Sequence, residues 1–376
     1  VPATTPNTAP TTSGIADFSY NEDPGFIHLD LKAVFADAED PDTALTFTIE
    51  NNTNPALFDA LTINGFGQLT HDFAADQNGA ATITIRATDT GGLFVETTYT
   101  VTINPVNDAP TLTALSHNPT YTEGNAAVNL FGFVTADPIE SGQTIEELVF
   151  TVTNVTDGSP QDNHELITLD GSTFALTDLA SGTTTNNGYG YSVSLTGTTA
   201  TVTLTTTGAT PANIANLGGS LSYSNSSENP TTLDRVFTIT SIKDSGGTAN
   251  GGIDTASPNL VSTVTVIAVN DAPVGVPAIT GTATEDQILT ADTSGISDAD
   301  GLGAFSYQWL RNGVAIGGAT GSTYTLGDAD VSTQISVQVS YTDLGGTNEG
   351  PLTSAQTAAV ANINDAPVLD TVGSPT

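Results

Sequence analysis

Carboxylate and asparagine side chains, which bind hard metal ions through oxygen, recur at fixed places along this chain. Val-Asn-Asp-Ala-Pro occupies 106–110 and 269–273, Ile-Asn-Asp-Ala-Pro occupies 363–367, and a shortened copy, Asn-Thr-Ala-Pro, occupies 7–10. In each full copy an apolar run ends, two oxygen-bearing side chains follow, and a proline stops the strand and holds the preceding residue extended. We interpret the copies as short, stiff, acidic joints between tandem modules.

Each module carries three further acidic groups. One comes early in the module, one forms a loop in its first half, and one is an aspartate placed before two glycines late in the module. In that order the groups are Glu22 with Asp23, Glu123, and Glu285 with Asp286; then Asp37 with Glu39 and Asp40, Asp137 with Glu140, and Asp298 with Asp300; and finally Asp89, Asp244 and Asp343.

These groups are expected to meet at the joints. The loops after the second and sixth strands of a seven-strand sandwich lie at one end of the domain, where the incoming joint also arrives. The sequence therefore predicts two ligand sets: Asp137 and Asp244 with Asn107 and Asp108, and Asp298, Asp300 and Asp343 with Asn270 and Asp271. Oxygen cages of this kind, without His or Cys, suit Ca2+, which takes about six to eight ligands in irregular geometry, better than octahedral Mg2+. Asp, Asn and Gly also form ordinary turns, and the recurrence of the whole set favours calcium.

The segments that must position these groups alternate apolar and polar residues, as strands with one buried face do. In the first module the runs are 45–49, 82–85 and 99–103, without a sustained helical period; in the second they are 148–152, 191–195, 201–204, 236–239 and 261–269. The predicted fold class is all-β, with three tandem β-sandwich domains in an elongated array. The predicted domains span 1–105, 106–268 and 269–363, and 364–376 begins the next linker.

Three local features depart from plain alternation. The second module has extra length, in which 211–218 begins with proline and ends with glycine and predicts a single helical turn. The Gly/Thr/Asn-rich segment 181–190 predicts a surface hairpin tip. In the third module an Asn-Gly turn at 312–313 follows a strand and predicts a hairpin, and the single tryptophan, Trp309, is expected to fill the core between the sheets.

Composition excludes several functions. Forty-one acidic residues against five basic ones give a net charge of −36. Such a chain has no basic patch to displace counterions from nucleic acid, and it disfavours anionic membranes. It contains no cysteine, so its modules are not held by disulfides, and it has no apolar run long enough to insert in a membrane. Because position 1 is not methionine, we expect a processed product or a segment of something longer.

Enzymatic motifs are not apparent. The four histidines are scattered, with no pair at metal-binding spacing. The string Asp-Ser-Gly-Gly at 244–247 is similar to part of a serine-protease signature. Its equivalents place Thr90 and Leu344 where Ser245 stands, so it is a repeated turn. We predict that the chain is not an enzyme.

The late part of the first module resembles the end of a cadherin repeat. There an alanine-x-aspartate loop, here Ala87-Thr88-Asp89, precedes the last strand, and an acidic linker binds calcium. More closely, the chain is similar to the cadherin-like and immunoglobulin-like repeats of giant bacterial surface proteins, the type I-secreted, RTX-type adhesins among them. The second module carries this resemblance at 221–230 with Arg235, and the third at 307–309, 321–326 and 328–331.

The resemblance implies a calcium site at each joint. The first would hold Glu22, Asn107, Asp108, Asp137 and Asp244; the second Glu123, Asn270, Asp271, Asp298, Asp300 and Asp343; and Asp37, Glu39, Asp40 and Asp89 would face the shortened N-terminal joint. Pro105 and Ala268 stand where cadherins place the first linker aspartate, and no clear Leu-Asp-Arg-Glu box is present. Asp72 or Asp76 is the candidate substitute in the first module, and each joint is expected to bind fewer ions than a cadherin linker.

The function expected from these features is a non-enzymatic, calcium-stiffened extracellular spacer in a bacterial cell-surface adhesin. Its partners would be neighbouring repeats of the same chain or identical subunits, together with a host-cell or matrix ligand. Two alternatives remain open: a self-assembling extracellular filament or surface-layer subunit, and a ligand-binding module with a glycan or peptide site around Tyr189 and Tyr191.

Overall fold

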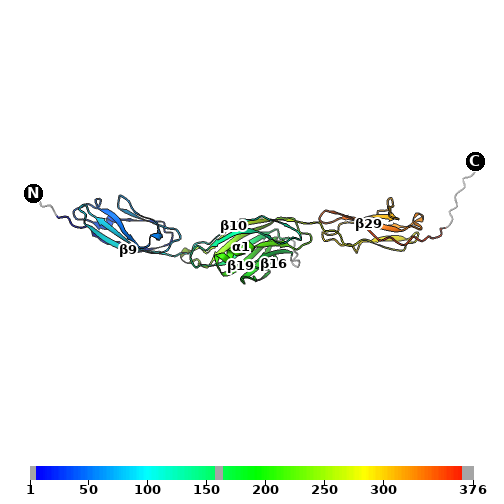
Figure 1. Ribbon diagram of the computed structural model, residues 1–376, viewed down its shortest axis with the longest axis horizontal. Helices are drawn as coiled ribbons and strands as arrows, with labels where there is room; N and C mark the ends of the chain where they lie inside the picture. Colours follow the sequence, from blue (N-terminus) through cyan, green and yellow to red (C-terminus); the bar gives the residue numbers. More distant parts are fainter. Residues whose placement is uncertain (1–5, 157–163, 366–376) are drawn as a thin grey trace, which may run out of the picture.

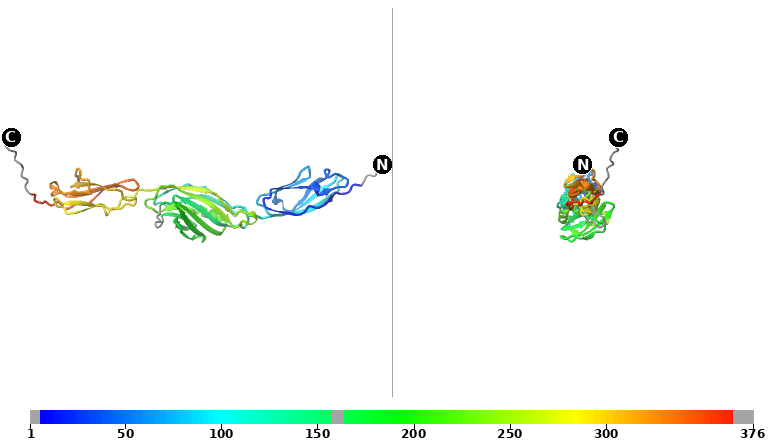
Figure 2. Two further views of the ribbon diagram at one scale, coloured as in Figure 1. Left: turned by 180° about the vertical axis from the view of Figure 1, so that it is seen from behind. Right: turned by 90° about the vertical axis from the view of Figure 1, so that its right-hand side faces the viewer.

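Three β-rich modules lie end to end. The computed structural model describes residues 6–156 and 164–365, and the first and last described residues lie at opposite ends of a narrow rod (Figure 1). The reverse view and the view along the rod show the same arrangement (Figure 2). Each module has its own hydrophobic core. The predicted all-β fold of tandem sandwiches is confirmed; of the expected linker 364–376, residues 366–376 lie outside the described residues.

Module 1 (β1–β9) packs a four-stranded sheet on a three-stranded sheet. The first sheet has the order Phe18–Asn21 (β2), Phe94–Asn104 (β9), Gly79–Thr88 (β8), Thr46–Asn52 (β5), and the second has the order Phe26–Asp30 (β3), Gln68–Phe73 (β7), Phe58–Ile63 (β6). The remaining elements are Thr11–Thr12 (β1), paired with Phe35–Ala36 (β4), and the 3-10 turns Leu31–Ala33 (η1) and Pro55–Leu57 (η2). Alternate residues of β8, such as Ile83 and Ile85, are fully buried, as their sequence period predicts.

The pairing of β2 with β9 decides where module 1 ends. The two strands run parallel, with Asn21 beside Asn104. The residues that follow each strand, Glu22 on one side and the linker on the other, therefore leave the module at the same end.

Module 2 (β10–β23) repeats this plan at greater size around one core. Its strands are Thr111–Ser116 (β10), Thr120–Thr122 (β11), Val128–Asn129 (β12), Phe131–Asp137 (β13), Ile145–Thr153 (β14), Glu165–Leu169 (β15), Ser172–Ala175 (β16), Ser181–Thr183 (β17), Gly190–Thr196 (β18), Thr199–Ala209 (β19), Ser222–Asn225 (β20), Arg235–Asp244 (β21), Thr255–Ala256 (β22) and Leu260–Ile267 (β23), with a 3-10 turn at Ala249–Gly251 (η3). They form an eight-stranded, a four-stranded and a two-stranded sheet. As in module 1, an early strand, β11, pairs parallel with the last strand, β23.

The helix of module 2 is longer than the sequence pattern predicted. It is not a single turn but Pro211–Ser220 (α1), ten residues long. The Thr210 hydroxyl accepts the backbone N–H of Asn213 at 3.3 Å and starts the helix. Gly218 does not end it, because the glycine lies where α1 packs on β13: a Cβ there would come within 2.6 Å of Val134.

The predicted hairpin at 181–190 is present as β17 and β18, but its tip is held down. The buried carboxylate of Asp170 accepts the hydroxyl of Thr184 at 2.5 Å and the backbone N–H of Asn187 at 2.9 Å. The tip therefore packs on the module instead of projecting freely.

Module 3 (β24–β30) is the smallest sandwich. One sheet has the order Ala278–Thr280 (β24), Ile288–Asp292 (β25), Thr323–Thr325 (β28); the other has the order Val314–Ala315 (β27), Ser306–Arg311 (β26), Ile335–Thr342 (β29), Asn348–Thr353 (β30); and a 3-10 turn spans Asp328–Asp330 (η4). Asn312 and Gly313 have positive φ angles of 49° and 80° in the predicted turn between β26 and β27. Trp309 is fully buried in the core, which confirms its structural role.

Candidate metal centres at the module joints

On the side of a joint where the chain leaves a module, a glutamate from the first part of that module is hydrogen-bonded to the module's own C-terminal end. At joint 1, the linker between modules 1 and 2, the N–H of Glu22 donates to Asn104 O at 3.0 Å, and Val106 N–H donates back to the Glu22 carboxylate at 2.5 Å. The parallel pairing of β2 and β9 makes this reciprocal contact possible. It places the Glu22 carboxylate beside the linker, where its second oxygen accepts the Asn78 amide in a long contact of 3.4 Å.

The same exchange recurs at the other two outgoing ends. At joint 2, between modules 2 and 3, Glu123 N–H donates to Ile267 O at 2.9 Å and receives Val269 N–H at 2.8 Å. At the end of module 3, Glu285 N–H donates to Ala361 O at 2.9 Å and its carboxylate receives Ile363 N–H at 3.0 Å.

The incoming half of joint 1 is built from the linker and two loops of module 2. The side-chain amide of Asn107 donates to Asp244 Oδ1 at 3.1 Å and to Ile253 O at 2.7 Å. The backbone N–H of Asp108 donates to Glu140 Oε1 at 2.9 Å. The predicted meeting of Asn107 with the Asp-x-Gly-Gly turn is therefore present.

The other joints vary this arrangement. At the N-terminal joint, Asn7 donates to Asp89 Oδ2 at 2.9 Å, while both the N–H and the hydroxyl of Thr8 donate to Glu39 Oε2. At joint 2, Asp271 N–H donates to Asp300 Oδ2 at 2.6 Å. The Asn270 amide does not reach the Asp-x-Gly-Gly turn there, but donates to Glu349 at 3.0 Å.

Carboxylates converge into triads at joint 1, at joint 2 and at the outgoing end of module 3. Within a triad the ligand oxygens all lie within 4.8 Å of one another, and the triads are Glu22–Asp108–Glu140 and Asp23–Asp76–Asp108 at joint 1, Glu123–Glu228–Asp271 at joint 2, and Glu285–Asp328–Asp365 at the end of module 3. Ligands about 2.4 Å from one calcium ion are at most about 4.8 Å apart, so the spacing fits a single shared ion. The first joint-1 triad joins module 1, the linker and module 2.

Buried oxygens without a hydrogen-bond partner also lie at the joints. Eight buried side-chain polar atoms among the described residues have no hydrogen-bond partner, and every one is an oxygen at a joint: Asn107 Oδ1, Asp108 Oδ2, Glu140 Oε2, Gln143 Oε1 and Asp244 Oδ2 at joint 1, Glu123 Oε1 and Asp343 Oδ2 at joint 2, and Asp37 Oδ2 at the N-terminal joint. Asp244 and Asp343 are only 1% and 5% exposed. Buried polar atoms are nearly always satisfied, so acceptors gathered without donors fit a cation. The donor set is all oxygen, as calcium requires.

The raised pKa values of the joint carboxylates also favour a bound cation. Burial, followed by the charges of Asp76, Asp23, Glu140 and Glu22, raises the pKa of Asp108 to about 6. Burial also raises the pKa of Glu123, with Asp271, Asp300 and Glu228 adding to the effect. The pKa of Asp244 is raised by burial and by Glu140 and Asp254. Without a cation these joints hold carboxylates that repel one another.

The remaining predicted ligands lie near the joints but outside the carboxylate triads. Asp137 is exposed, and its Oδ1 accepts Ile139 N–H at 2.9 Å. Asp298 receives Asp300 N–H and the Tyr341 hydroxyl. Asp37 receives the N–H groups of Glu39 and Asp40, and Asp40 receives both the N–H and the hydroxyl of Thr90. The structure thus gathers Asp37, Glu39, Asp40 and Asp89 around the N-terminal joint.

Several triad residues were outside the predicted ligand set: Asp23, Glu140, Glu228, Glu285, Asp328 and Asp365. Of the two candidate substitutes in module 1, Asp76 belongs to a joint 1 triad and Asp72 does not. Asp76, Glu228 and Asp328 share one feature that was available in the sequence. Each lies in the loop that precedes the long strand ending at the Asp-x-Gly-Gly turn, namely β8, β21 or β29.

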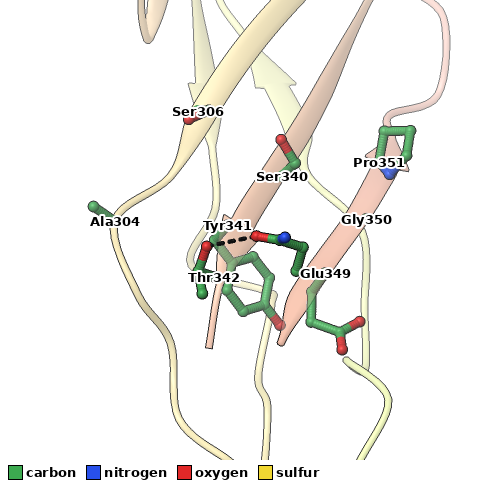
Figure 3. A pocket seen from close by; sticks show the side chains of 9 residues that line it. Ala304, Ser306, Ser340, Tyr341, Thr342, Glu349, Gly350 and Pro351 are labelled. Atoms are coloured by element: carbon green, nitrogen blue, oxygen red, sulfur yellow. Dashed lines mark hydrogen bonds between the residues drawn. The ribbon is translucent and has the colours of Figure 1, made fainter. Parts of the chain in front are cut away.

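A surface pocket of about 430 Å3 opens on module 3 beside joint 2 (Figure 3). It is lined by Ala304, Ser306, Ser340, Tyr341, Thr342, Asn348, Glu349, Gly350 and Pro351. Thr342 donates to Asn348 at 2.7 Å, and Glu349 is the residue that receives the Asn270 amide. The lining of the pocket contains no basic or histidine side chain, and Glu349 is already hydrogen-bonded to the linker of joint 2.

The alternative ligand site around Tyr189 and Tyr191 is not exposed as an aromatic platform. Tyr189 is 9% exposed and belongs to the module 2 core. The Tyr191 ring stacks on Phe174 with centroids 4.1 Å apart. Both rings are already used in packing.

Comparison with known proteins gives structural neighbours only. No family model matches the chain, and no curated protein matches it. Mouse cadherin-23 EC22–24 is 14% identical, with 95% of this chain and 100% of that chain covered and a TM-score of 0.37. Protocadherin gamma B2 domains 1–5 are 13% identical, with 95% and 60% covered and a TM-score of 0.35. Drosophila N-cadherin EC1–4 is 13% identical, with 91% and 72% covered and a TM-score of 0.29.

The chain thus spans about 60% of the protocadherin structure. Cadherin tandems are among the solved structures that it is similar to, and its fold rests on the strand pairing described above. No helix in the described part of the chain is long and apolar enough to cross a membrane.

Proposed function

We propose that this chain is a calcium-stiffened spacer: a non-enzymatic segment of an extracellular stalk in which Ca2+ ions bind at the joints between modules. The observation that carries the proposal is the set of buried, unpartnered oxygens at the joints. Carboxylates of two modules and the linker converge at joint 1, and carboxylates of module 2 and the linker converge at joint 2. The ion pairs of Arg86, Lys243 and Arg311 are with acids outside the triads, so those cations do not neutralise the joints.

The proposed mechanism is electrostatic. Without the ion, Glu22, Asp108 and Glu140 repel one another across joint 1, and the linker flexes. With Ca2+ bound, carboxylates of modules 1 and 2 share one charge centre, and the angle between the modules is fixed. At joint 1 we propose as ligands the residues of its two triads together with Asn107, Asp137 and Asp244. At joint 2 we propose the residues of its triad together with Asp300 and Asp343.

The wider setting that we propose is a bacterial cell-surface adhesin, on the sequence resemblance to the repeats of such proteins. The partners would then be neighbouring repeats or identical subunits. The triad Glu285–Asp328–Asp365 supports such a partner, because all three carboxylates come from the outgoing side of module 3 and its last linker. An incoming acidic loop, like that of Glu140 at joint 1, would complete it. A repeat of the same chain or a separate subunit could supply that loop.

Small-angle X-ray scattering in millimolar Ca2+ and then in EDTA tests the spacer proposal. We expect a rod in Ca2+ and a shorter, more flexible particle in EDTA, with the rod recovered when Ca2+ is restored. Mg2+ at the same concentration should restore it less well, because the sites are irregular oxygen cages. A scattering profile that is the same in all four conditions would refute the proposal.

A further inference from the structure

The two joints are not built alike. Among the described residues, joint 1 has two triads that share Asp108, and five buried, unpartnered oxygens; joint 2 has one triad and two such oxygens. Joint 1 therefore concentrates more unsatisfied negative charge between its modules. Its geometry depends more heavily on bound cations.

Joint 2 has instead a direct hydrogen bond between modules. Asn229 Nδ2, in the loop 226–234 of module 2, donates to the backbone carbonyl of Asp300 in module 3 at 3.0 Å. The acceptor is fixed, because Asp300 is 2% exposed and its carboxylate receives Asp271 N–H at 2.6 Å. This bond needs no metal.

The loop that carries Asn229 is held by a buried ion pair. Arg235 is fully buried; its guanidinium donates to Glu165 Oε1 at 2.7 Å and to both the carbonyl and the hydroxyl of Thr231. It also donates to Leu233 O, and Tyr223 donates to the other Glu165 oxygen at 2.6 Å. The loop is therefore preorganised before module 3 docks, which lowers the entropic cost of the contact.

Joint 1 shows no contact of comparable quality in the described part of the chain. The hydrogen bond that crosses from module 1 to module 2 there joins Asn21 Nδ2 to Asn250 O at 3.5 Å, which is too long for a strong N–H···O bond. The acids that surround joint 1 add repulsion instead.

We propose that Asn229, on the Arg235-clamped loop 226–234, is a cation-independent latch onto module 3, so that joint 2 keeps its angle at cation levels where joint 1 has loosened. The rod then bends first at joint 1. The latch itself rests on the hydrogen bond alone, while the looseness of joint 1 without cations rests on the proposed function.

Distance measurements by double electron–electron resonance test the two joints separately. The chain contains no cysteine, so spin labels can be placed at exposed sites by substitution. The pair Asn51→Cys with Ser194→Cys spans joint 1, and the pair Ser194→Cys with Val314→Cys spans joint 2. Each pair is measured in millimolar Ca2+ and in EDTA, with and without Asn229→Ala. The matched control is Asn21→Ala, which removes the long contact at joint 1.

We expect EDTA to broaden the joint 1 distances and to leave the joint 2 distances narrow. Asn229→Ala in EDTA should lower the ratio of docked to undocked molecules at joint 2 about fivefold, which is the change expected when one hydrogen bond is lost. Asn21→Ala should leave the joint 1 distances like those of the parent protein. Joint 2 distances that broaden in EDTA without any substitution, or that stay narrow in Asn229→Ala, would overturn the latch. Joint 1 distances unaffected by EDTA would instead overturn the calcium spacer and leave the latch to be judged on joint 2 alone.

Discussion

The side-chain amide of Asn107 donates to Asp244 Oδ1 at 3.1 Å, which ties the linker of joint 1 to the Asp-x-Gly-Gly turn of module 2. Asn7 and Asp89 make the same contact at 2.9 Å at the N-terminal joint. The amide nitrogen is used in this bond, and Asn107 Oδ1 and Asp244 Oδ2 remain buried without a partner. The asparagine thus presents an oxygen to the joint while its nitrogen fixes its orientation.

Asn107→Asp replaces this buried donor by a second carboxylate. In EDTA the two acids repel, and we expect module 2 to lose about 2 kcal/mol of stability, or about 4–8 °C in its melting temperature. Ca2+ should restore most of that loss, because both carboxylates can bind the ion. Differential scanning calorimetry with and without Ca2+ measures both effects; a loss that Ca2+ does not reduce would show that no cation binds between these residues.

Asp108→Asn should have opposite effects in Ca2+ and in EDTA. Asp108 belongs to both triads of joint 1, so its loss should weaken Ca2+ binding at that joint at least about tenfold, or about 1.4 kcal/mol. In EDTA the substitution removes repulsion, and the joint should become less flexible than in the parent protein.

Titration calorimetry and scattering check these two outcomes. Asp42→Asn is the matched control, since it removes the same charge from an exposed site in the acidic loop at the far end of module 1. Equal losses of affinity in both variants would assign the effect to net charge instead of the joint.

Module 1 should lose stability as pH falls, independently of the joints. His71 is fully buried; its Nε2 lies 2.6 Å from the Tyr99 hydroxyl, and its Nδ1 lies 3.3 Å from Ile27 O. Burial lowers the pKa of His71, and His28 lowers it further. The unfolded chain therefore takes up a proton near pH 6.5 before the folded module does, and stability falls as pH drops below that value, by up to about 1.4 kcal/mol per pH unit.

Urea denaturation between pH 8 and pH 5 measures this dependence. His71→Gln should be less stable at pH 8 but should show a smaller slope below pH 6.5. The exposed His28 provides the control, because His28→Gln should keep most of the parent slope. An unchanged slope in His71→Gln would exclude the buried imidazole as its source.

The sequence predicted the strands and the joints better than it predicted the full ligand sets. Alternation along β8 and β9 is a local signal, and the joint motif repeats in full, so both were accessible without a structure. Glu228 and Asp328 reach their joints from loops of different length and composition, and no short motif links them to Asp76. The length of α1 was underestimated because Gly218 has the appearance of a stop signal, whereas the tertiary contact with Val134 requires its small size.

Gly246→Ala tests whether the shape of joint 1 matters apart from its charge. A Cβ at Gly246 would lie 1.5 Å from Asn107 Oδ1 and 2.5 Å from Gln143 Nε2, so the methyl group must displace two side chains whose oxygens face the joint. We expect a loss of Ca2+ affinity at joint 1 of about tenfold or more, without any change in net charge. The equivalent turn of module 3 supplies the control: a Cβ at Gly345 would lie 3.4 Å from Asp343 Oδ1, an ordinary contact. Gly345→Ala should bind Ca2+ like the parent protein, and similar titration curves for the two variants would show that the position of Asn107 does not govern ion binding.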